Sequence, residues 1–363
     1  MGTIPSMIDP DRGAALARLD AEVRGQSGRG RWLVLTHDNP DPDALASGAL
    51  LARLLRQRYR RQGTSAYGGI IGRAENQEMV RALRLELSPV RSLSWRRFRH
   101  VALVDTQPET GNNALPADRP PDLVFDHHPA RRASTTAAYA DIRPDYGATA
   151  TLIAEYLEAA EIPLGRVEAS ALIYAIRTET LDFRREAAEP DRRQFARAFP
   201  IADKRALARI SNPRLPFGYF QVLHRALENL EAVGTLIVSH LGELEHPDLV
   251  PEIADLLVRM ETRTWSFVSG AWQDRVYLSL RTTNPRGDAG RLMRRLVGRH
   301  GKGGGHGMLA GGWVPVTAGS RSGAAADIHR RLARRVATAL RKDPDRLAPL
   351  PLAPLAEEAG ATD

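Results

Sequence analysis

The chain has 363 residues, 43% hydrophobic and 26% charged, which is typical of a soluble globular protein with room for two hydrophobic cores. It contains no cysteine, so disulfide bonds and thiolate metal sites are excluded and any metal must bind to His, Asp or Glu. The net charge of +8 comes almost entirely from Arg, which suits phosphate-bearing partners. A compositional bias toward Ala and Arg would give the same charge, so charge alone does not indicate nucleic-acid binding.

The N-terminal stretch MGTIPS matches the myristoylation pattern, but so short a pattern is matched often by chance, and nothing else in the sequence indicates membrane association. No stretch reaches the roughly 20 apolar residues of a membrane span, and the N-terminus lacks the basic and then apolar layout of a signal peptide. We therefore expect a soluble, cytoplasmic protein.

The first 190 residues alternate between expected strands and helices. The apolar pattern predicts buried strands at 31–36, 100–105 and 122–125, and helices at 43–61, 149–162 and 168–183. This alternation predicts an α/β domain over 1–190, with a parallel sheet and helices on both faces. Polar residues that follow such strands meet at the carboxyl edge of the sheet, where sites form.

The remaining chain predicts a linker and a second domain. We expect a helical linker over 191–232, interrupted at 211–220, and a smaller α/β domain over 233–342. The apolar pattern and composition place the elements of this domain as follows: strands at 234–241, 264–272 and 275–282, a helix at 288–300, a glycine-rich stretch at 301–314 and a basic helix near 323–341. Residues 343–363, rich in Pro, Ala and acidic residues, are expected to be disordered.

Acidic and histidine residues follow all three strands of the first domain. They number three histidines and four aspartates: His37, Asp41, Asp43, Asp105, Asp126, His127 and His128. Asp43 by itself could be the N-cap of the following helix, and Asp105 by itself could begin an ordinary loop. Together the seven residues are enough to bind two divalent cations, which act in pairs on phosphoryl groups. Asp105, alone at the end of the central strand, is the candidate for the bridging carboxylate.

Five motifs in order resemble the DHH family of phosphoesterases with a C-terminal DHH-associated domain. They are HDNPDPD at 37–43, the lone Asp105, DHH at 126–128, RTETLDFRR at 177–185, and GKGGGHGMLAGG at 301–312. The resemblance therefore extends from about residue 37 to residue 312.

The resemblance implies two metal ions, and it assigns their ligands. His37, Asp41 and Asp105 would bind one ion, and Asp43, Asp105 and His127 the other, with Mn²⁺ expected and Mg²⁺ or Co²⁺ as alternatives. A hydroxide that bridges the two ions would attack phosphorus.

The resemblance also implies how the substrate is held. His128 would contact the substrate phosphate, so that His128 and Asp105 are the expected catalytic residues. Gly303, Gly304, Gly305 and His306 would bind the substrate from the other side of an interdomain cleft. Consecutive glycines also allow backbone N–H groups to approach an anion closely. A glycine-rich turn without such a role remains the alternative for this stretch.

The fourth motif departs from the family pattern at Glu179, where the family has a metal-binding Asp. We keep Glu179 in the expected metal set, and Asp182, three residues further on, could compensate for it. Asp126 is expected to hold a histidine in place rather than to bind metal. Arg281 and Arg299 are candidate phosphate or base contacts.

Length and domain layout resemble the branch of the family that acts on very short nucleic acids. That branch includes bifunctional oligoribonucleases (nanoRNases) that also remove phosphate from adenosine 3′,5′-bisphosphate, and enzymes that hydrolyse linear or cyclic dinucleotides. The expected partners are thus short RNA or DNA oligonucleotides or nucleotides, and a homodimer is one assembly that the resemblance allows. Two alternatives stay open: a catalytically weak, nucleotide-binding regulatory relative, suggested by Glu179, and a single-strand nucleic-acid binder, suggested by the Arg excess.

Overall fold

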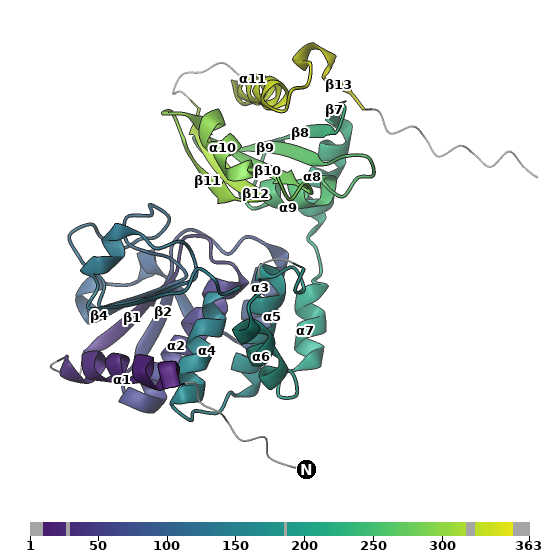
Figure 1. Cartoon of the computed structure of the whole chain (residues 1–363). Helices are drawn as coiled ribbons and strands as arrows, with labels where there is room; N and C mark the ends of the chain where they lie inside the picture. Colours follow the sequence, from purple (N-terminus) through teal and green to yellow (C-terminus); the bar gives the residue numbers. More distant parts are fainter. Residues whose placement is uncertain (1–9, 27–29, 185–186, 317–323, 351–363) are drawn as a thin grey trace, which may run out of the picture. The chain divides into compact units, whose positions relative to one another are not determined.

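The computed structural model describes residues 10–26, 30–184, 187–316 and 324–350 in two compact units, 1–213 and 214–363 (Figure 1). The expected linker over 191–232 is divided between them. Its helices α6 (Glu189–Ala198) and α7 (Lys204–Ser211) belong to the first unit, and α8 (Phe217–Glu228) belongs to the second.

The first unit contains a parallel sheet of six strands in the order β3-β2-β1-β4-β5-β6. The strands expected from the sequence are confirmed as β1, β4 and β5. The short strands β2, β3 and β6, which have few apolar residues, were not expected. Because the strand order reverses between β1 and β4, these two strands form the switch point at which sites of such sheets lie. The bounds are β1 (Arg31–Leu35), β2 (Gly63–Tyr67), β3 (Leu87–Pro89), β4 (Phe98–Val104), β5 (Leu123–Asp126) and β6 (Tyr139–Ile142).

The α/β class is confirmed, but the helices do not cover both faces of this sheet as expected. The larger core joins one face of the sheet to α-helices. On the other face, Leu33, Val101 and Leu103 are covered by partly buried residues of short 3-10 turns and loops, such as Trp95 and Leu115. The reason is that the described connections after β4 and β5 contain no α-helix. The helices of this unit before α6 are α1 (Pro10–Gly25), α2 (Pro42–Tyr59), α3 (Ala74–Leu83), α4 (Thr149–Ala159) and α5 (Arg166–Glu179).

Helix α5 ends four residues earlier than the sequence pattern predicts. Leu181, Asp182 and Phe183 adopt left-handed φ angles of 49°, 55° and 63°, a conformation that an α-helix cannot contain. Glu179 is therefore the last residue of α5, directly before this left-handed turn.

The second unit is built on a seven-stranded sheet in the order β11-β12-β10-β9-β8-β7-β13. Strands β8 and β9 are parallel, and the other pairs are antiparallel. Helices α8 and α9 (Leu249–Leu257) pack on one face, and α10 (Ala289–Val297) and α11 (Ala324–Ala339) pack on the other. The strands are β7 (Glu231–Val233), β8 (Leu236–Glu243), β9 (Trp265–Trp272), β10 (Arg275–Thr282), β11 (Lys302–His306), β12 (Leu309–Pro315) and β13 (Ala348–Pro349).

Two stretches to which the sequence pattern assigned no helix or strand form regular structure in this unit. The glycine-rich stretch forms the hairpin of β11 and β12, in which Gly303 pairs with Gly312 and Gly304 with Gly311. Residues 344–349 form a 3-10 turn and strand β13, which pairs with β7, so the expectation of disorder is wrong for this part of 343–363. Both stretches are ordered because their backbones pair with a neighbouring strand, and amino-acid composition does not predict such pairing.

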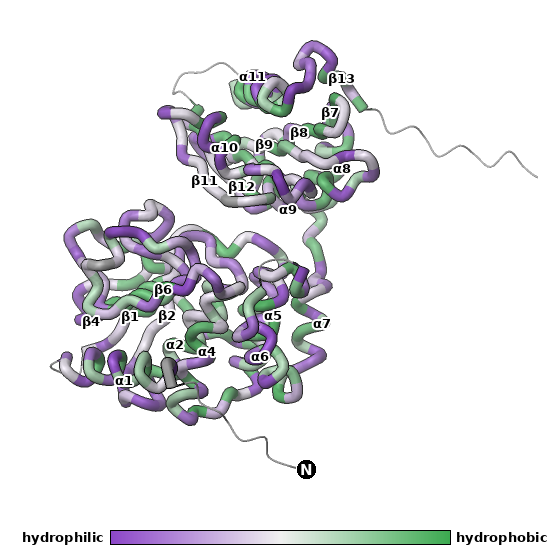
Figure 2. The backbone as a smooth tube through the Cα atoms, viewed as in Figure 1, coloured by the Kyte–Doolittle hydropathy of each residue, from purple (hydrophilic) through white to green (hydrophobic). Residues whose placement is uncertain are grey.

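Hydropathy follows this architecture. Figure 2 shows hydrophobic residues on the strands and inner helix faces, and hydrophilic residues on the outer turns. Among the described residues, no helix combines the length and the apolar character needed to cross a membrane.

Candidate metal centre

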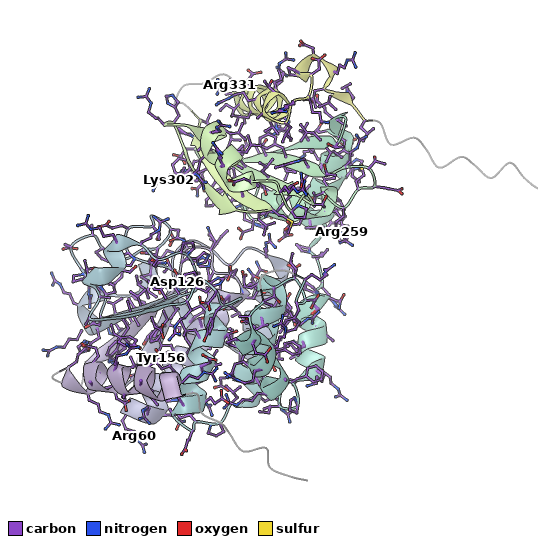
Figure 3. All side chains as sticks on the ribbon, in the orientation of Figure 1. Arg60, Asp126, Tyr156, Arg259, Lys302 and Arg331 are labelled. Atoms are coloured by element: carbon purple, nitrogen blue, oxygen red, sulfur yellow. The ribbon has the colours of Figure 1, made fainter. Side chains whose placement is uncertain are left out.

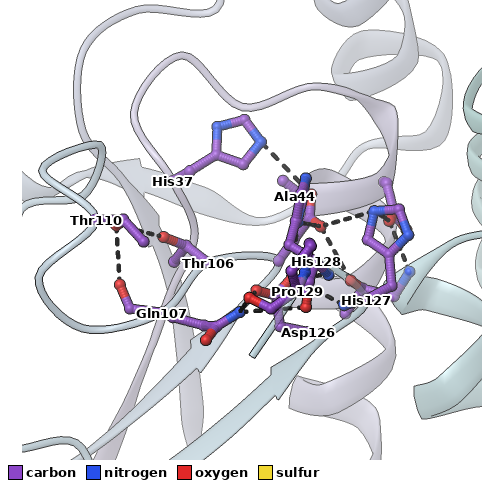
Figure 4. A network of polar contacts seen from close by, with 12 residues as sticks. His37, Ala44, Thr106, Gln107, Thr110, Asp126, His127, His128 and Pro129 are labelled. Atoms are coloured by element: carbon purple, nitrogen blue, oxygen red, sulfur yellow. Dashed lines mark hydrogen bonds and ion pairs between the residues drawn. The ribbon is translucent and has the colours of Figure 1, made fainter. Parts of the chain in front are cut away.

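The polar residues expected from the sequence meet at the carboxyl edge of the first sheet. His37 follows β1, Asp105 follows β4 and Asp126 ends β5. Asp126 is almost fully buried, at 1% exposure, within the first unit (Figure 3). Figure 4 shows His37, Asp126, His127 and His128 around this edge, held by a network of polar contacts.

His37, Asp41 and Asp105 form a group that could hold a metal ion. The His37 Nε2 atom lies 3.6 Å from Asp41 Oδ2 and 3.5 Å from Asp105 Oδ2. Asp41 is also the N-cap of α2, because its Oδ1 accepts hydrogen bonds from the backbone N–H groups of Asp43 and Ala44, each at 3.0 Å. The capping role considered for Asp43 thus belongs to Asp41, whose second oxygen remains directed at His37.

A second group that could hold an ion shares Asp105 and contains His127 and His128. His127 Nε2 lies 3.7 Å from Asp105 Oδ1 and 3.9 Å from Asp43 Oδ2. Asp105 therefore offers one oxygen to each group and could be a ligand in both.

Two of the three histidines near Asp105 are oriented alike by backbone carbonyls. His37 Nδ1 lies 2.9 Å from the carbonyl oxygen of Asp38, and His127 Nδ1 lies 3.1 Å from that of Tyr146. A ring that donates from Nδ1 to a carbonyl keeps its lone pair on Nε2, the usual arrangement of a metal-binding histidine. Both Nε2 atoms point at carboxylates, so the donor set fits divalent cations.

Asp105 has an unusual backbone conformation for a residue with a side chain. Its φ is 58°, in the left-handed region that costs about 1–2 kcal/mol for residues other than glycine. The hydrogen bond from its N–H to the Phe125 carbonyl, at 2.9 Å, and the bond from Thr149 Oγ1 to its Oδ1, at 2.9 Å, hold it there. Backbone strain of this kind is commonly found at functional sites.

Asp43 is fully buried against the N-terminus of α4. Its Oδ2 accepts a hydrogen bond from Thr149 N–H at 2.7 Å, and its Oδ1 accepts one from Ala150 N–H at 2.8 Å. Thr149 therefore connects Asp43 and Asp105, and the positive end of the helix dipole lies beside both.

Negative charge is in excess at this site. Burial, followed by the charges of Asp105, Glu179 and Asp41, raises the pKa of Asp43 well above its usual value. Burial opposes protonation of His37, yet the charges of Asp41 and Asp105 raise the pKa of His37 well above its usual value. Both pKa shifts arise because several carboxylates lie close together in a buried place. A divalent cation bound there would neutralise their negative charge.

Asp126 orients His128. Its Oδ1 accepts hydrogen bonds from the backbone N–H groups of His127 and His128, at 2.9 Å and 3.2 Å, and lies 2.9 Å from His128 Nδ1. Burial opposes protonation of His128, but the hydrogen bond to Asp126, with the charges of Asp105 and Asp126, raises the pKa of His128 to about 9. With Nδ1 bonded to Asp126, Nε2 is the ring nitrogen of His128 that can donate elsewhere.

Gln107 completes this arrangement, and sequence reasoning did not identify it. Its side-chain amide donates to Asp126 Oδ2 at 2.6 Å, and its Oε1 accepts from Arg131 N–H at 2.7 Å and Ser134 Oγ at 2.8 Å. Its position two residues after Asp105, at the same sheet edge, was the one available signal. Thr149 was also missed, because nothing in the sequence around a helix start shows which distant carboxylates it meets.

Glu179 and Asp182 lie in different surroundings. Glu179 is half-buried and close enough to Asp43 for its charge to raise the pKa of that carboxyl. Asp182 is exposed, and its Oδ1 lies 2.7 Å from Arg177 Nε. Of the two, Glu179 is thus the residue that acts on the acidic cluster.

The remaining predicted residues lie in the second unit. The guanidinium of Arg281 is largely buried and bonded to Asp255 and to the carbonyl oxygens of Leu280 and Ala310, so these contacts anchor it within the unit. Arg299 is exposed after α10, and Gly303, Gly304 and Gly305 lie on edge strand β11. The side chain of His306 is outside the described part of the structure.

Two domain families match the chain at the units just described. Residues 31–176 match the N-terminal domain of the DHH family, and residues 234–340 match the DHHA1 domain. The chain therefore contains a DHH domain followed by a DHHA1 domain. The family name comes from the triplet that Asp126, His127 and His128 form here, so the site lies on its defining motif.

Known proteins resemble this DHH chain over different lengths. An uncharacterized protein of Methanocaldococcus jannaschii is 34% identical over 286 residues, which are 78% of this chain and 58% of that protein. A Deinococcus radiodurans protein described as a probable manganese-dependent inorganic pyrophosphatase is 31% identical over 180 residues, 47% of this chain and 53% of that protein. The chain thus spans a little over half the length of these curated relatives.

A solved structure shares the fold. The exopolyphosphatase-related protein from Bacteroides fragilis superposes with a TM-score of 0.69 at 13% identity, over 93% of this chain and all of that one. At this identity the likeness shows the fold alone.

Proposed function

We propose that this chain is a phosphoesterase that uses two divalent cations to hydrolyse very short oligonucleotides or dinucleotides, or adenosine 3′,5′-bisphosphate. The observation that carries the proposal is Asp105, which offers one oxygen to each of two groups of ligand atoms. Paired cations activate water and neutralise charge on phosphoryl oxygens, so such a centre suits phosphoester hydrolysis.

The side chains of the site have separate tasks in this proposal. His37, Asp41 and Asp105 would hold one ion, and Asp43, Asp105 and His127 the other, with Glu179 at the edge of the second set. Mn²⁺ is the proposed ion because mixed carboxylate and imidazole ligands suit it and because a relative is described as manganese-dependent.

His128 is proposed to contact the substrate. Its Nδ1 lies 2.9 Å from Asp126 Oδ1, which leaves an Nε2–H that can donate to a phosphoryl oxygen. A donor placed where charge develops lowers the barrier to reaction, and Asp126 and Gln107 keep this one in position.

The substrate class is the least constrained part of the proposal. The two-domain layout supports short nucleic acids, whereas the names of two similar proteins refer to pyrophosphate and polyphosphate. A panel containing a dinucleotide, a cyclic dinucleotide, adenosine 3′,5′-bisphosphate, pyrophosphate and polyphosphate, each assayed with Mn²⁺ and with Mg²⁺, separates these substrates. We expect the fastest turnover on the dinucleotide or the bisphosphate with Mn²⁺.

The Asp105→Ala variant tests the centre itself. It should lose at least about 10³-fold in kcat on the best substrate, because both cation sites lose a ligand. Asp145→Ala, which removes an exposed aspartate before α4, should keep full activity. Undiminished activity of the wild type in excess chelator would contradict the proposal.

The alternative is a nucleotide-binding regulatory relative, and Glu179 is the feature that favours it. Glu179→Asp distinguishes the two functions. A working enzyme should change modestly or lose activity, whereas a weak relative should gain turnover when the family residue is restored. Binding of a dinucleotide without turnover by the wild type would establish the alternative.

A further inference from the structure

An open basic pocket lies at the β7–β13 edge of the second sheet. Its volume is about 520 Å³, and its charged lining consists of Arg263, Arg341, Lys342 and Arg346 with a single carboxylate, Asp343. Four cations and one carboxylate leave an excess of three positive charges around one cavity.

Most of this positive charge is not neutralised by neighbouring carboxylates. Within the described chain, neither Arg341 nor Lys342 has an ion pair with an acidic residue. Arg346 Nε lies 3.6 Å from Asp343 Oδ2, in an exposed pair of small energetic value. Arg263 lines the pocket and donates to the Gly234 carbonyl, and no acidic side chain of the described chain pairs with it.

The rest of the pocket is apolar and shaped by the backbone. Val233, Pro349 and Leu350 line it beside the cations. Gly234 has a φ of 53°, and a Cβ atom there would lie 3.3 Å from Lys342 Nζ, so glycine leaves room for the lysine side chain to cross the turn. A cavity of this size with an apolar surface and a few charged groups is typical of small-molecule sites.

We propose that this pocket binds a nucleoside polyphosphate, with the phosphates against Arg263, Arg341 and Lys342 and the base against Val233 and Pro349. The excess of three positive charges matches a ligand with several anionic phosphates, and Arg holds phosphate oxygens in a bidentate manner. The apolar lining favours a ligand that also carries a ring.

This pocket is separate from strand β11, whose glycines the sequence motif assigns to the substrate. Strands β11 and β13 are the two opposite edges of the sheet, six strand spacings apart, which is roughly 29 Å. The inference therefore does not depend on the proposed hydrolysis.

Isothermal titration with ATP in excess EDTA, where the metal centre cannot turn ATP over, tests the proposal. The wild type should bind one ATP per second unit, and the double variant Arg341→Gln/Lys342→Gln should bind it at least about 10-fold more weakly. The matched control is Arg330→Gln/Arg331→Gln, which removes two exposed charges from α11 (Figure 3), about 11 residues or 16 Å before the pocket. The control should bind ATP within about 2-fold of the wild type.

Further titrations distinguish the possible outcomes. Inorganic tripolyphosphate should bind more weakly than ATP if the apolar lining takes the base, and equal binding would overturn the nucleoside assignment. Equal weakening by the two double variants would overturn the proposal, since it would show only general attraction to a chain with a pI near 10.1. The Asp105→Ala variant should bind ATP like the wild type in EDTA. ATP binding at the pocket is therefore tested independently of whether the proposed hydrolysis is correct.

Discussion

The side chains around Asp126 show how a single residue acquires its role from its contacts. Asp126 is buried and binds His128 with one oxygen and Gln107 with the other. His127, next in the chain, is oriented instead by the Tyr146 carbonyl. Both histidines keep Nε2 available, and they differ in the partner of Nδ1: a backbone carbonyl for His127 and a carboxylate for His128. The carboxylate favours a protonated His128 whose Nε2–H can donate, which suits the proposed phosphate contact, whereas a carbonyl partner suits the proposed metal ligand.

Gln107→Glu should impair His128 through Asp126. It replaces an N–H donor 2.6 Å from Asp126 Oδ2 with a second carboxylate, so His128 loses its fixed orientation. We expect kcat to fall about 10- to 100-fold with little change in KM, measured on the best substrate of the panel. Asn113→Asp makes the same chemical change in the same loop without touching Asp126 and should have a much smaller effect on kcat; equal losses would show that Gln107 only supports the loop.

At the scale of the element, the glycine-rich strand β11 shows two different reasons for glycine. A Cβ atom at Gly303 would lie 3.0 Å from Met293 Cγ and Val297 Cγ2, so this glycine allows α10 to pack closely. At Gly304 a Cβ would meet nothing within 4 Å. Packing therefore explains Gly303 and does not explain Gly304, for which the expected approach of a substrate to the backbone is the role to test.

Alanine at these two glycines should separate stability from binding. Gly303→Ala should lower the free energy of unfolding by about 1–3 kcal/mol through overpacking, measured by chemical denaturation. Gly304→Ala should leave stability within about 0.5 kcal/mol and raise KM on the best substrate. A Gly304→Ala variant with unchanged KM would contradict substrate contact at this strand.

Helix α11 carries a buried histidine, His329, that should make the second unit sensitive to acid. His329 stacks on Phe267 and His240, and its Nδ1 lies 2.8 Å from Ser269 Oγ. Burial, with smaller contributions from the charges of His240 and Arg330, lowers the pKa of His329 to about 3. Because the folded state needs the neutral ring, its stabilisation is complete above the unfolded pKa, near 6.5, and declines as the pH falls toward 3.

Lowering the pH from 7 to 5 should therefore destabilise the second unit by about 2 kcal/mol through His329. Thermal unfolding followed across this range measures the effect. His329→Phe, which keeps a stacked ring but cannot bind a proton, should flatten the profile, and His224→Gln, at an exposed histidine, should not. A wild-type profile that is level between pH 7 and 5 would show that the imidazole is not buried as described.

At the scale of the whole molecule, the metal ligands and the glycine strand belong to separate compact units with separate cores. The expected cation ligands, including Glu179, all come from the first unit. Metal binding should therefore stabilise one unit and leave the other unaffected.

Calorimetry should resolve this difference as two unfolding transitions. At Mn²⁺ concentrations about 100-fold above Kd, the first unit should gain about 2.7 kcal/mol and its transition should move up, while that of the second unit stays in place. Asp105→Ala should abolish the shift. A uniform shift of both transitions would mean that the units unfold together.

The sequence by itself determined the α/β class, the main strands and most helices, because apolar spacing reports which faces are buried. It also located the acidic and histidine residues at the ends of β1, β4 and β5, since a parallel sheet brings those ends to one edge. The order of the motifs also indicated the family, because the polar residues of three motifs follow strands whose ends a parallel sheet brings to one edge.

Contacts between distant segments were decided only by the tertiary structure. Thr149 joins Asp43 to Asp105, and Gln107 holds Asp126. The order at 344–349 and the loops on one face of the first sheet were equally unpredictable. Each depends on a partner that lies far away in the sequence, and local propensity carries no information about which partner that is.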